Sequence, residues 1–170
     1  GLRDDTLFIF LSDNGATFQR NPYQDGSNLP LFRGKGSSWD GGVRVPACAS
    51  WPARIPAGVD QPAPFFVTDL LPTIPGLAGA TLGPAITLDG RDILSVLEGA
   101  TPDPQRVIHL ANTNVFEAVR RGRYKYRLGE LYDLETDIDE QVNLAATLPQ
   151  IAQELSQELS AIIADVASDN

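Results

Sequence analysis

The sequence predicts an α/β fold: the end of a domain with a buried, mostly parallel sheet, followed by a small antiparallel four-stranded sheet packed with a C-terminal helix. Two observations carry this prediction. Residues 7–11, LFIFL, are apolar without alternation, which is typical of a strand covered on both faces. After residue 99 the pattern changes to short alternating runs separated by turns, and it ends in a helical periodicity. We therefore expect two parts, residues 1–100 and residues 101–170.

The composition excludes several classes of function. With 170 residues, 42% of them apolar and 21% charged, the chain can form one sizeable globular core. Its net charge of -9 argues against nucleic acid as a partner, because phosphate binding requires a basic surface. No apolar run approaches the roughly 18 residues that would span a membrane. A single cysteine excludes an internal disulfide framework.

The first strand ends at the turn SDNG, residues 12–15. Asp13 and Asn14 supply a carboxylate and an amide oxygen, which are hard ligands that suit Ca²⁺ or Mg²⁺ better than zinc. In open α/β sheets, ligands bind beyond the carboxyl ends of the strands. Both residues are therefore candidate metal ligands. The alternative is an Asx turn that only ends the strand.

A long, polar, glycine-rich segment follows at residues 16–44, and loops of this length are usually functional or disordered. Lys35 lies between two glycines, so its ammonium could point at a ligand while the backbone approaches an anion closely. A solvated loop lysine is the alternative. Arg33 and Arg44 could add to the positive field, although we expect each to pair with Asp40 or another acid.

The middle of the chain predicts a short strand at residues 45–51, in which Cys48 is expected to be a small buried side chain. Thr68 is a candidate cap for a helix that continues to residue 78. Pro75 should kink or shorten that helix, because proline cannot donate the intrahelical hydrogen bond.

The last part predicts four strands, at residues 107–112, 115–121, 124–128 and 131–134, joined by short turns. The acidic segment ETDIDE, residues 135–140, is expected to be a solvated turn. A helix then closes the chain, with an apolar face that consists of Ile151, Leu155, Leu159, Ile162, Ile163 and Val166.

Over nearly its whole length the chain resembles the C-terminal portion of the type I sulfatases, which are arylsulfatase-like members of the alkaline phosphatase superfamily. The segments that carry this resemblance are, in order, TLFIFLSDNGA, RGKGSSWDGGVRVPA, WPARIPAG, TDLLPTIPGLAGA, LDGRDI, RRGRYKY and LYDLETDIDEQVNLA.

The resemblance implies roles for individual residues. It makes Asp13 and Asn14 ligands of one Ca²⁺ ion, and it makes Lys35 a catalytic residue that contacts the sulfate of the substrate. It also implies that residues 1–100 end an alkaline-phosphatase-like sheet domain. Asn14 favours a sulfatase over the two-zinc phosphatases of the superfamily, because the metal sites of those phosphatases would be expected to contain histidine.

Other parts of a sulfatase active site are missing from this chain. Sulfatases attack with a formylglycine made from the Cys or Ser of a C/S-x-P-x-R motif, which lies in their N-terminal half together with further metal ligands and catalytic histidines. We therefore expect the N-terminal part of the same sulfatase to be a partner that completes the calcium site, and we expect this chain to be inactive alone. The lack of an initiator methionine also indicates a fragment or processed piece. A periplasmic or secreted location is expected.

Two features imitate functional motifs. Residues 50–54, SWPAR, fit the formylglycine pattern. The longer segment SWPARIPAG, residues 50–58, contains two prolines and a glycine, so we do not expect it to open the helix whose N-terminus would favour an anion. His109 lies in the expected C-terminal sheet, where a structural or surface role is expected. The functions that remain open are a sulfatase acting on aryl or carbohydrate sulfates, a related phosphate or phosphonate ester hydrolase, and a non-catalytic binding module.

Overall fold

The structure is a computed structural model that describes residues 1–17, 26–83 and 87–168. The chain forms two compact units, and each unit is built from two separate segments. One consists of Gly1–Phe10 and Cys48–Asp103, and the other consists of Leu11–Ala47 and Pro104–Asn170. The second unit thus combines the glycine-rich segment with the C-terminal part of the chain. The division into a sheet domain and a subdomain at residue 100 stays a prediction.

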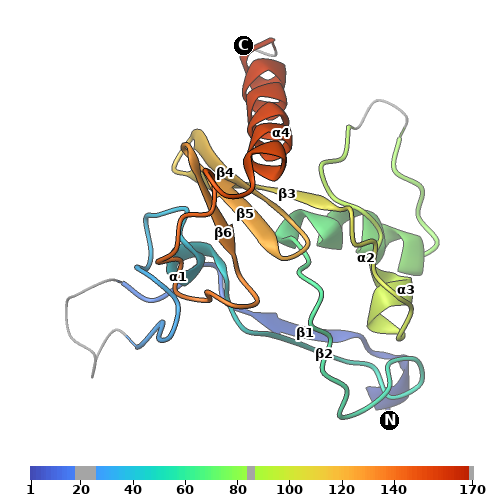
Figure 1. The fold of residues 1–170 in the computed structure, drawn as a ribbon. Coiled ribbons are helices and arrows are strands. Elements are labelled where there is room, and N and C mark those ends of the chain that lie inside the picture. The colour runs from blue at the N-terminus through green and yellow to red at the C-terminus, as the bar shows by residue number, and fades with distance from the viewer. Residues whose placement is uncertain (18–25, 84–86, 169–170) are drawn as a thin grey trace. The chain divides into compact units, whose positions relative to one another are not determined.

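The regular elements of the first unit are short helices and most of a two-stranded sheet (Figure 1). The sheet contains β1 (Phe8–Leu11) and β2 (Ala47–Ser50). The helices are η1 (Arg3–Asp5), η2 (Val67–Asp69), α2 (Leu70–Leu77) and α3 (Leu94–Leu97).

The predicted helix is present, but Thr68 does not cap it. Asp69 is the residue before α2, but its side chain makes no hydrogen bond to that helix. Its carboxylate instead accepts hydrogen bonds from the amide of Phe66 at the start of η2, at 2.7 Å, and from the amide of Arg91, at 2.9 Å. Thr68 Oγ1 is buried and has no hydrogen-bond partner among the described residues. The helix ends at Leu77, two residues after Pro75, as expected for a helix that a proline shortens.

Two expectations about burial in the first sheet are wrong for this chain. Phe8 and Phe10 of β1 are 58% and 61% exposed, and Cys48 of β2 is also exposed. The physical reason is that β1 and β2 form a sheet of only two strands, and the described residues do not cover it. A sheet interior needs neighbours on both faces before an apolar run is buried.

The second unit contains the predicted antiparallel sheet and helix. Its strands are β3 (Val107–Asn112), β4 (Val115–Arg121), β5 (Tyr124–Arg127) and β6 (Glu130–Asp133), and they pair in chain order. A β-bulge shifts the register between Leu110 and Ala111. The other elements are the four-residue helix α1 (Asp40–Val43) and the long helix α4 (Pro149–Ser168). The expected fold class, mixed α/β with these C-terminal elements, is therefore confirmed.

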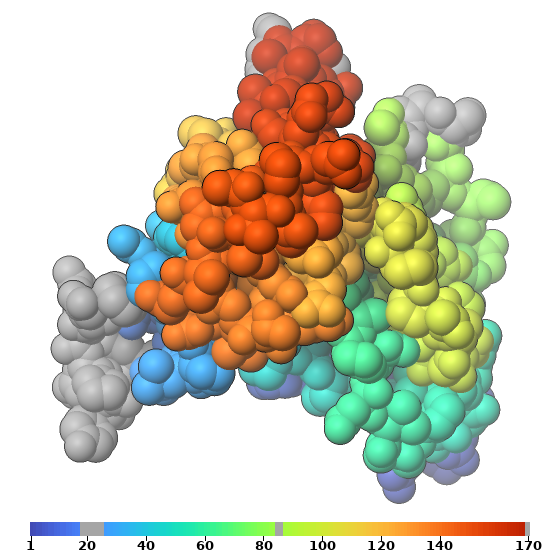
Figure 2. Space-filling model, in the orientation of Figure 1, coloured from blue at the N-terminus to red at the C-terminus, as the bar shows by residue number. Residues whose placement is uncertain are grey.

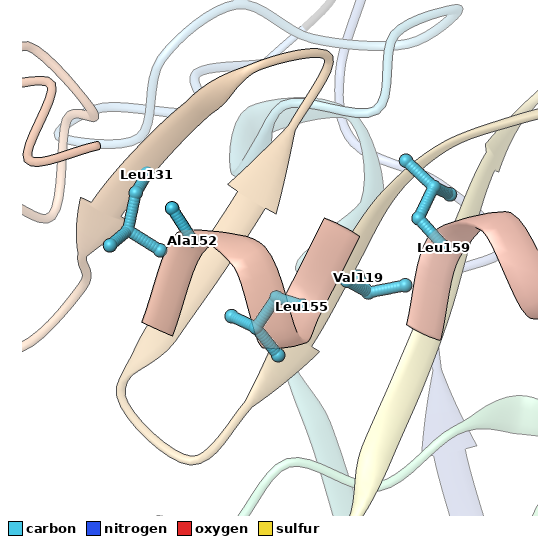
Figure 3. Close-up of a cluster of buried hydrophobic side chains, with 5 residues drawn as sticks. All are labelled: Val119, Leu131, Ala152, Leu155 and Leu159. Carbon is cyan, nitrogen blue, oxygen red and sulfur yellow. The ribbon is translucent and has the colours of Figure 1, made fainter. Parts of the chain in front are cut away.

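One face of this sheet packs against α4. The buried residues come from two strands and from successive turns of the helix, and Figure 3 shows that they meet in one cluster. Helical spacing explains the pattern, because positions three and four residues apart share one face. The cluster consists of Val119, Leu131, Ala152, Leu155 and Leu159.

The apolar face of α4 is longer than the sheet it covers. Ile163 and Val166, which the sequence places on the buried face, are 46% and 41% exposed. The last turns of α4 stand clear of the sheet surface (Figure 2). Within the described residues, no helix has both the length and the apolar character needed to cross a membrane.

The opposite face of the sheet carries polar and aromatic side chains. Cross-strand register places Arg120 beside Lys125 and Lys125 beside Tyr132. Tyr132 packs with Trp39, the residue immediately before α1. The sheet therefore lies between α4 on one face and the segment that contains α1 on the other.

Candidate functional site

The turn that contains the predicted metal ligands follows β1 directly. Ser12 Oγ donates a 2.9 Å hydrogen bond to the carbonyl oxygen of Asn14, which closes the turn. The Asp13 residue is exposed and Asn14 is half-buried. Immediately after them, the amide of Gly15 donates a 3.0 Å hydrogen bond to the carbonyl of Gly42 in α1. The turn is thus attached to α1.

Glycine is required at this attachment because two backbone segments touch there. A Cβ atom on Gly15 would lie 1.8 Å from the carbonyl oxygen of Gly41. A Cβ atom on Gly41 would in turn lie 2.3 Å from the carbonyl oxygen of Arg33. Real Cβ atoms do not approach so closely, so the SDNG turn, α1 and the loop around Arg33 can meet only through glycines.

The Lys35 loop lies against the same turn. The amide of Lys35 donates a 3.0 Å hydrogen bond to the carbonyl of Ala16, two residues after Asn14. Ser37 Oγ donates to the carbonyl of Gly34 at 2.7 Å, which tightens the loop around Lys35. Lys35 itself is exposed, and its ammonium has no ion-pair partner within the part of the chain that the structure describes.

Sequence reasoning missed Asn28, which joins these two segments. Its Oδ1 accepts a 2.7 Å hydrogen bond from the amide of Ala16, and its Nδ2 donates to the carbonyls of Ala16 at 2.8 Å and Arg33 at 3.0 Å. The only signal in the sequence is an amide side chain within a polar loop. That signal is too common in loops to identify the residue in advance.

The two flanking arginines differ in their partners. The expected pairing of Arg44 is confirmed, since its Nη1 lies 3.7 Å from Asp40 Oδ2. Arg33 instead lies over the ring of Phe32, with Cζ 5.4 Å from the ring centroid. Arg33 also has a positive φ of 61°, a conformation that side-chain-bearing residues rarely adopt.

A buried ion cluster lies beneath α1. The ammonium of Lys125 is 2.8 Å from Asp40 Oδ1 and 2.7 Å from Glu140 Oε1. Burial raises the pKa of Glu140, while the Lys125 charge opposes that effect. The expectation that residues 135–140 form a solvated turn is therefore wrong for Glu140, which is only 2% exposed. The physical reason is that its carboxylate pairs with Lys125, a buried cation on β5.

A second polar cluster holds the residues just before α1. Ser38 Oγ donates to Glu117 Oε2 at 2.6 Å and accepts from Arg127 Nε at 2.9 Å. Burial acts to raise the pKa of Glu117, but hydrogen bonds from Ser38 and Asn112 and the charge of Arg127 outweigh it and lower the pKa. The Arg127 guanidinium also lies 4.5 Å from the ring centroid of Trp39.

The chemistry of the turn fits a hard cation. Asp13 and Asn14 present one carboxylate and one amide at adjacent positions, and both offer oxygen ligands. Among residues 1–17, 26–83 and 87–168, no group of three or more His, Cys, Asp and Glu side chains could hold a metal ion. A Ca²⁺ ion bound by Asp13 and Asn14 would therefore need further ligands, which no such group of described side chains provides.

The two imitating motifs lie away from the turn in the chain and have ordinary surroundings. Ser50 is the exposed last residue of β2, and the residues after it form turns instead of a helix. Arg54 pairs with Glu98 at 2.5 Å. His109 lies in β3 and makes an edge-to-face contact with Phe116.

Comparisons with known proteins agree on one family. A family model described as Sulfatase matches residues 1–80. Arylsulfatase G of Mus musculus is 32% identical over 99% of this chain and 39% of its own length. Arylsulfatase A of Homo sapiens is 35% identical over 92% of this chain and 38% of its own length.

Solved structures show the same relationship. The crystal structure of the PsFucS1 sulfatase from Pseudoalteromonas sp. superposes with a TM-score of 0.82 at 25% identity, and the match covers 95% of this chain and 37% of that one. The chain thus spans less than two fifths of the length of each of these three proteins. Sequence and structure together show that the chain belongs to the sulfatase family.

Proposed function

We propose that this chain supplies part of the active site of an enzyme that hydrolyses sulfate esters. In this proposal Asp13 and Asn14 are ligands of a Ca²⁺ ion, and Lys35 is a catalytic residue that binds the sulfate. The observation that carries the proposal is the 3.0 Å hydrogen bond between Lys35 N and Ala16 O, which ties the lysine loop to the turn with the two oxygen ligands.

The arrangement suits the charge that develops during cleavage of an S–O bond. Negative charge collects on the sulfonyl oxygens and on the leaving oxygen, and fixed cations stabilise it. When bound, Ca²⁺ would supply positive charge beside the sulfate. Lys35 would supply a second positive charge from a loop whose backbone is held at Ala16 and at Gly34.

The proposal requires a second part of the enzyme. Ca²⁺ takes about six to eight oxygen ligands, and Asp13 and Asn14 provide two side chains. We assign the remaining ligands and the formylglycine nucleophile to the N-terminal part of the same sulfatase. Exposed apolar side chains in the first unit support a covering partner of this kind, and they include Phe8, Phe10, Val67, Leu71 and Ile74.

The test compares the purified 170-residue chain with the full-length protein on a chromogenic aryl sulfate. Both relatives are named arylsulfatases, which favours this substrate; a carbohydrate sulfate is the second one to assay. We expect turnover by the full-length protein and none by the chain alone, because the nucleophile is outside it. Cell fractionation tests the accompanying proposal of a periplasmic or secreted location.

Two outcomes would contradict the proposal. Full-length protein that hydrolyses an aryl phosphate or phosphonate ester faster than the sulfate would indicate the related ester hydrolase. Full-length protein that carries formylglycine and Ca²⁺ but hydrolyses none of these esters would indicate a non-catalytic binding module.

A further inference from the structure

Lys125 is a fully buried cation in the middle of a four-stranded sheet, with an exposed fraction of 0%. A buried ammonium is costly unless it is paired, and pairing rarely makes such a cluster more stable than apolar packing. The opposite face of the same sheet is closed by apolar packing against α4. Fold stability alone therefore does not explain the choice of lysine at this position.

The partners of Lys125 come from two distant segments of the chain. Its ammonium donates a hydrogen bond to Asp40 Oδ1, 85 residues away, and lies 2.7 Å from Glu140 Oε1. Glu140 Oε2 accepts a 2.7 Å hydrogen bond from the amide of Asp40, 100 residues away in sequence. Asp40, the first residue of α1, is therefore held through both its side chain and its backbone.

The helix that begins at Asp40 carries both halves of the candidate site. Gly42 accepts a hydrogen bond from Gly15, which immediately follows the two metal ligands. Gly41 donates a 3.0 Å hydrogen bond to the carbonyl of Phe32, at the start of the Lys35 loop. A displacement of α1 would therefore move the SDNG turn and the lysine loop together.

We propose that Lys125 is a positioning residue, which holds α1 through Asp40 and Glu140 and thereby sets the places of Lys35 and of the Asp13–Asn14 turn. This inference rests on the function proposed above for those three residues. It gives the C-terminal sheet an indirect role in the reaction, because Lys125 acts on the site through α1 and not by contact with the substrate.

The experiment measures hydrogen exchange by mass spectrometry in the full-length protein, in which Lys125→Met is compared with the wild type. Arg121→Met is the matched control, since Arg121 is a cation on β4 whose partner, Glu154, lies on α4. We expect Lys125→Met to raise exchange in residues 31–44 by about tenfold or more, while residues 107–121 stay as protected as in the wild type. Arg121→Met should leave residues 31–44 unchanged.

Kinetics provide the second readout. Mispositioned catalytic groups lower the rate of the chemical step, so kcat should fall about 10²-fold in Lys125→Met with a smaller change in KM. The exchange result does not depend on activity. If the wild-type protein failed to hydrolyse sulfates, the proposed function would fail while exchange still reported whether Lys125 holds the loop.

A double variant covers the case in which Lys125→Met does not fold because two buried carboxylates lose their cation. Lys125→Met with Glu140→Gln removes one of those charges, and it should fold with the same localised exchange in residues 31–44. Wild-type exchange in residues 31–44 in either variant would overturn the proposal. Loss of protection throughout the C-terminal sheet in both variants would overturn it as well, because Lys125 would then support the whole fold.

Discussion

The backbone amide of Lys35 donates a 3.0 Å hydrogen bond to the carbonyl of Ala16, and this contact joins two segments with separate proposed roles. Ala16 follows the turn that contains Asp13 and Asn14. Because this hydrogen bond uses backbone atoms, it does not depend on the side chain of Lys35. The side chain of Lys35 can therefore be changed without loss of the loop that carries it.

Lys35→Ala should slow turnover of the full-length enzyme by about 10²–10³-fold, since removal of one positioned charge donor typically costs about 3 kcal/mol. Lys35→Arg should rescue poorly, because a planar guanidinium cannot replace a compact ammonium in a tight loop. Steady-state kinetics measure the rates, and circular dichroism checks the fold.

Ser50→Ala is the control for this prediction. It should leave both turnover and the formylglycine content unchanged, because Ser50 is an exposed strand end followed by turns. An indifferent Lys35 together with an essential Ser50 that carries an aldehyde, detected by mass spectrometry, would show that the sequence motif was assigned wrongly.

Asp13→Ala should remove calcium and activity together from the full-length enzyme, because a carboxylate is the stronger of the two ligands in the turn. The 170-residue chain should bind Ca²⁺ weakly, since two side chains provide few of the oxygens that the ion requires. Metal content by mass spectrometry and calorimetric titration measure these effects. An Asp13→Ala enzyme with full calcium content would refute the assignment.

Gly15→Ala should destabilise the chain by roughly 2 kcal/mol or more, because overpacking forces the surrounding backbone to shift. The added Cβ would lie 1.8 Å from the carbonyl oxygen of Gly41. Gly76→Ala is the matched control, since a Cβ at that helical position meets nothing within 4 Å. It should be neutral or stabilising by up to about 1 kcal/mol. Urea unfolding measures both; equal effects would mean that the close approach is not required.

The C-terminal sheet was predictable because its signals are local. Alternation and short turns gave strands at residues 107–112 and 115–121, as found, and placed the last two within one residue. Helical spacing likewise identified Leu155 and Leu159 as buried. It did not show where the sheet stops, so the exposure of Ile163 and Val166 was not anticipated.

Features that depend on distant partners were not predictable in this way. Glu140 was expected to lie in a solvated turn, and no feature of the sequence indicated that Lys125 is buried, yet both are buried with Asp40. A charged residue is predicted to be exposed unless its partner is known. Here Asp40 is the shared partner, and it lies 85 residues from Lys125 and 100 residues from Glu140 in the chain. Asn28 was missed for the same reason, since its role depends on Ala16.

Stability should depend on pH through Asp133, which Arg123 holds with two hydrogen bonds. The Arg123 hydrogen bonds lower the pKa of Asp133 below its ordinary value. A lowered pKa stabilises the fold above the unfolded value of about 3.9, and this contribution is lost as pH falls through the lower folded pKa. Asp133→Asn should therefore lower the urea midpoint at pH 7, and the difference from the wild type should shrink towards pH 3.

Glu140 has a raised pKa, which affects stability with the opposite sign: its contribution is present at low pH and is lost as pH rises. Because both proteins retain Glu140, the difference between Asp133→Asn and the wild type reports on Asp133. Glu154→Gln is the control, because Glu154 is 58% exposed in its ion pair with Arg121 and exposed pairs contribute little. Its urea midpoint should stay near that of the wild type at every pH. A midpoint difference for Asp133→Asn that is the same at pH 7 and pH 3 would show that the ionised carboxylate does not stabilise the fold, and that Asp133 acts through its hydrogen-bond geometry alone.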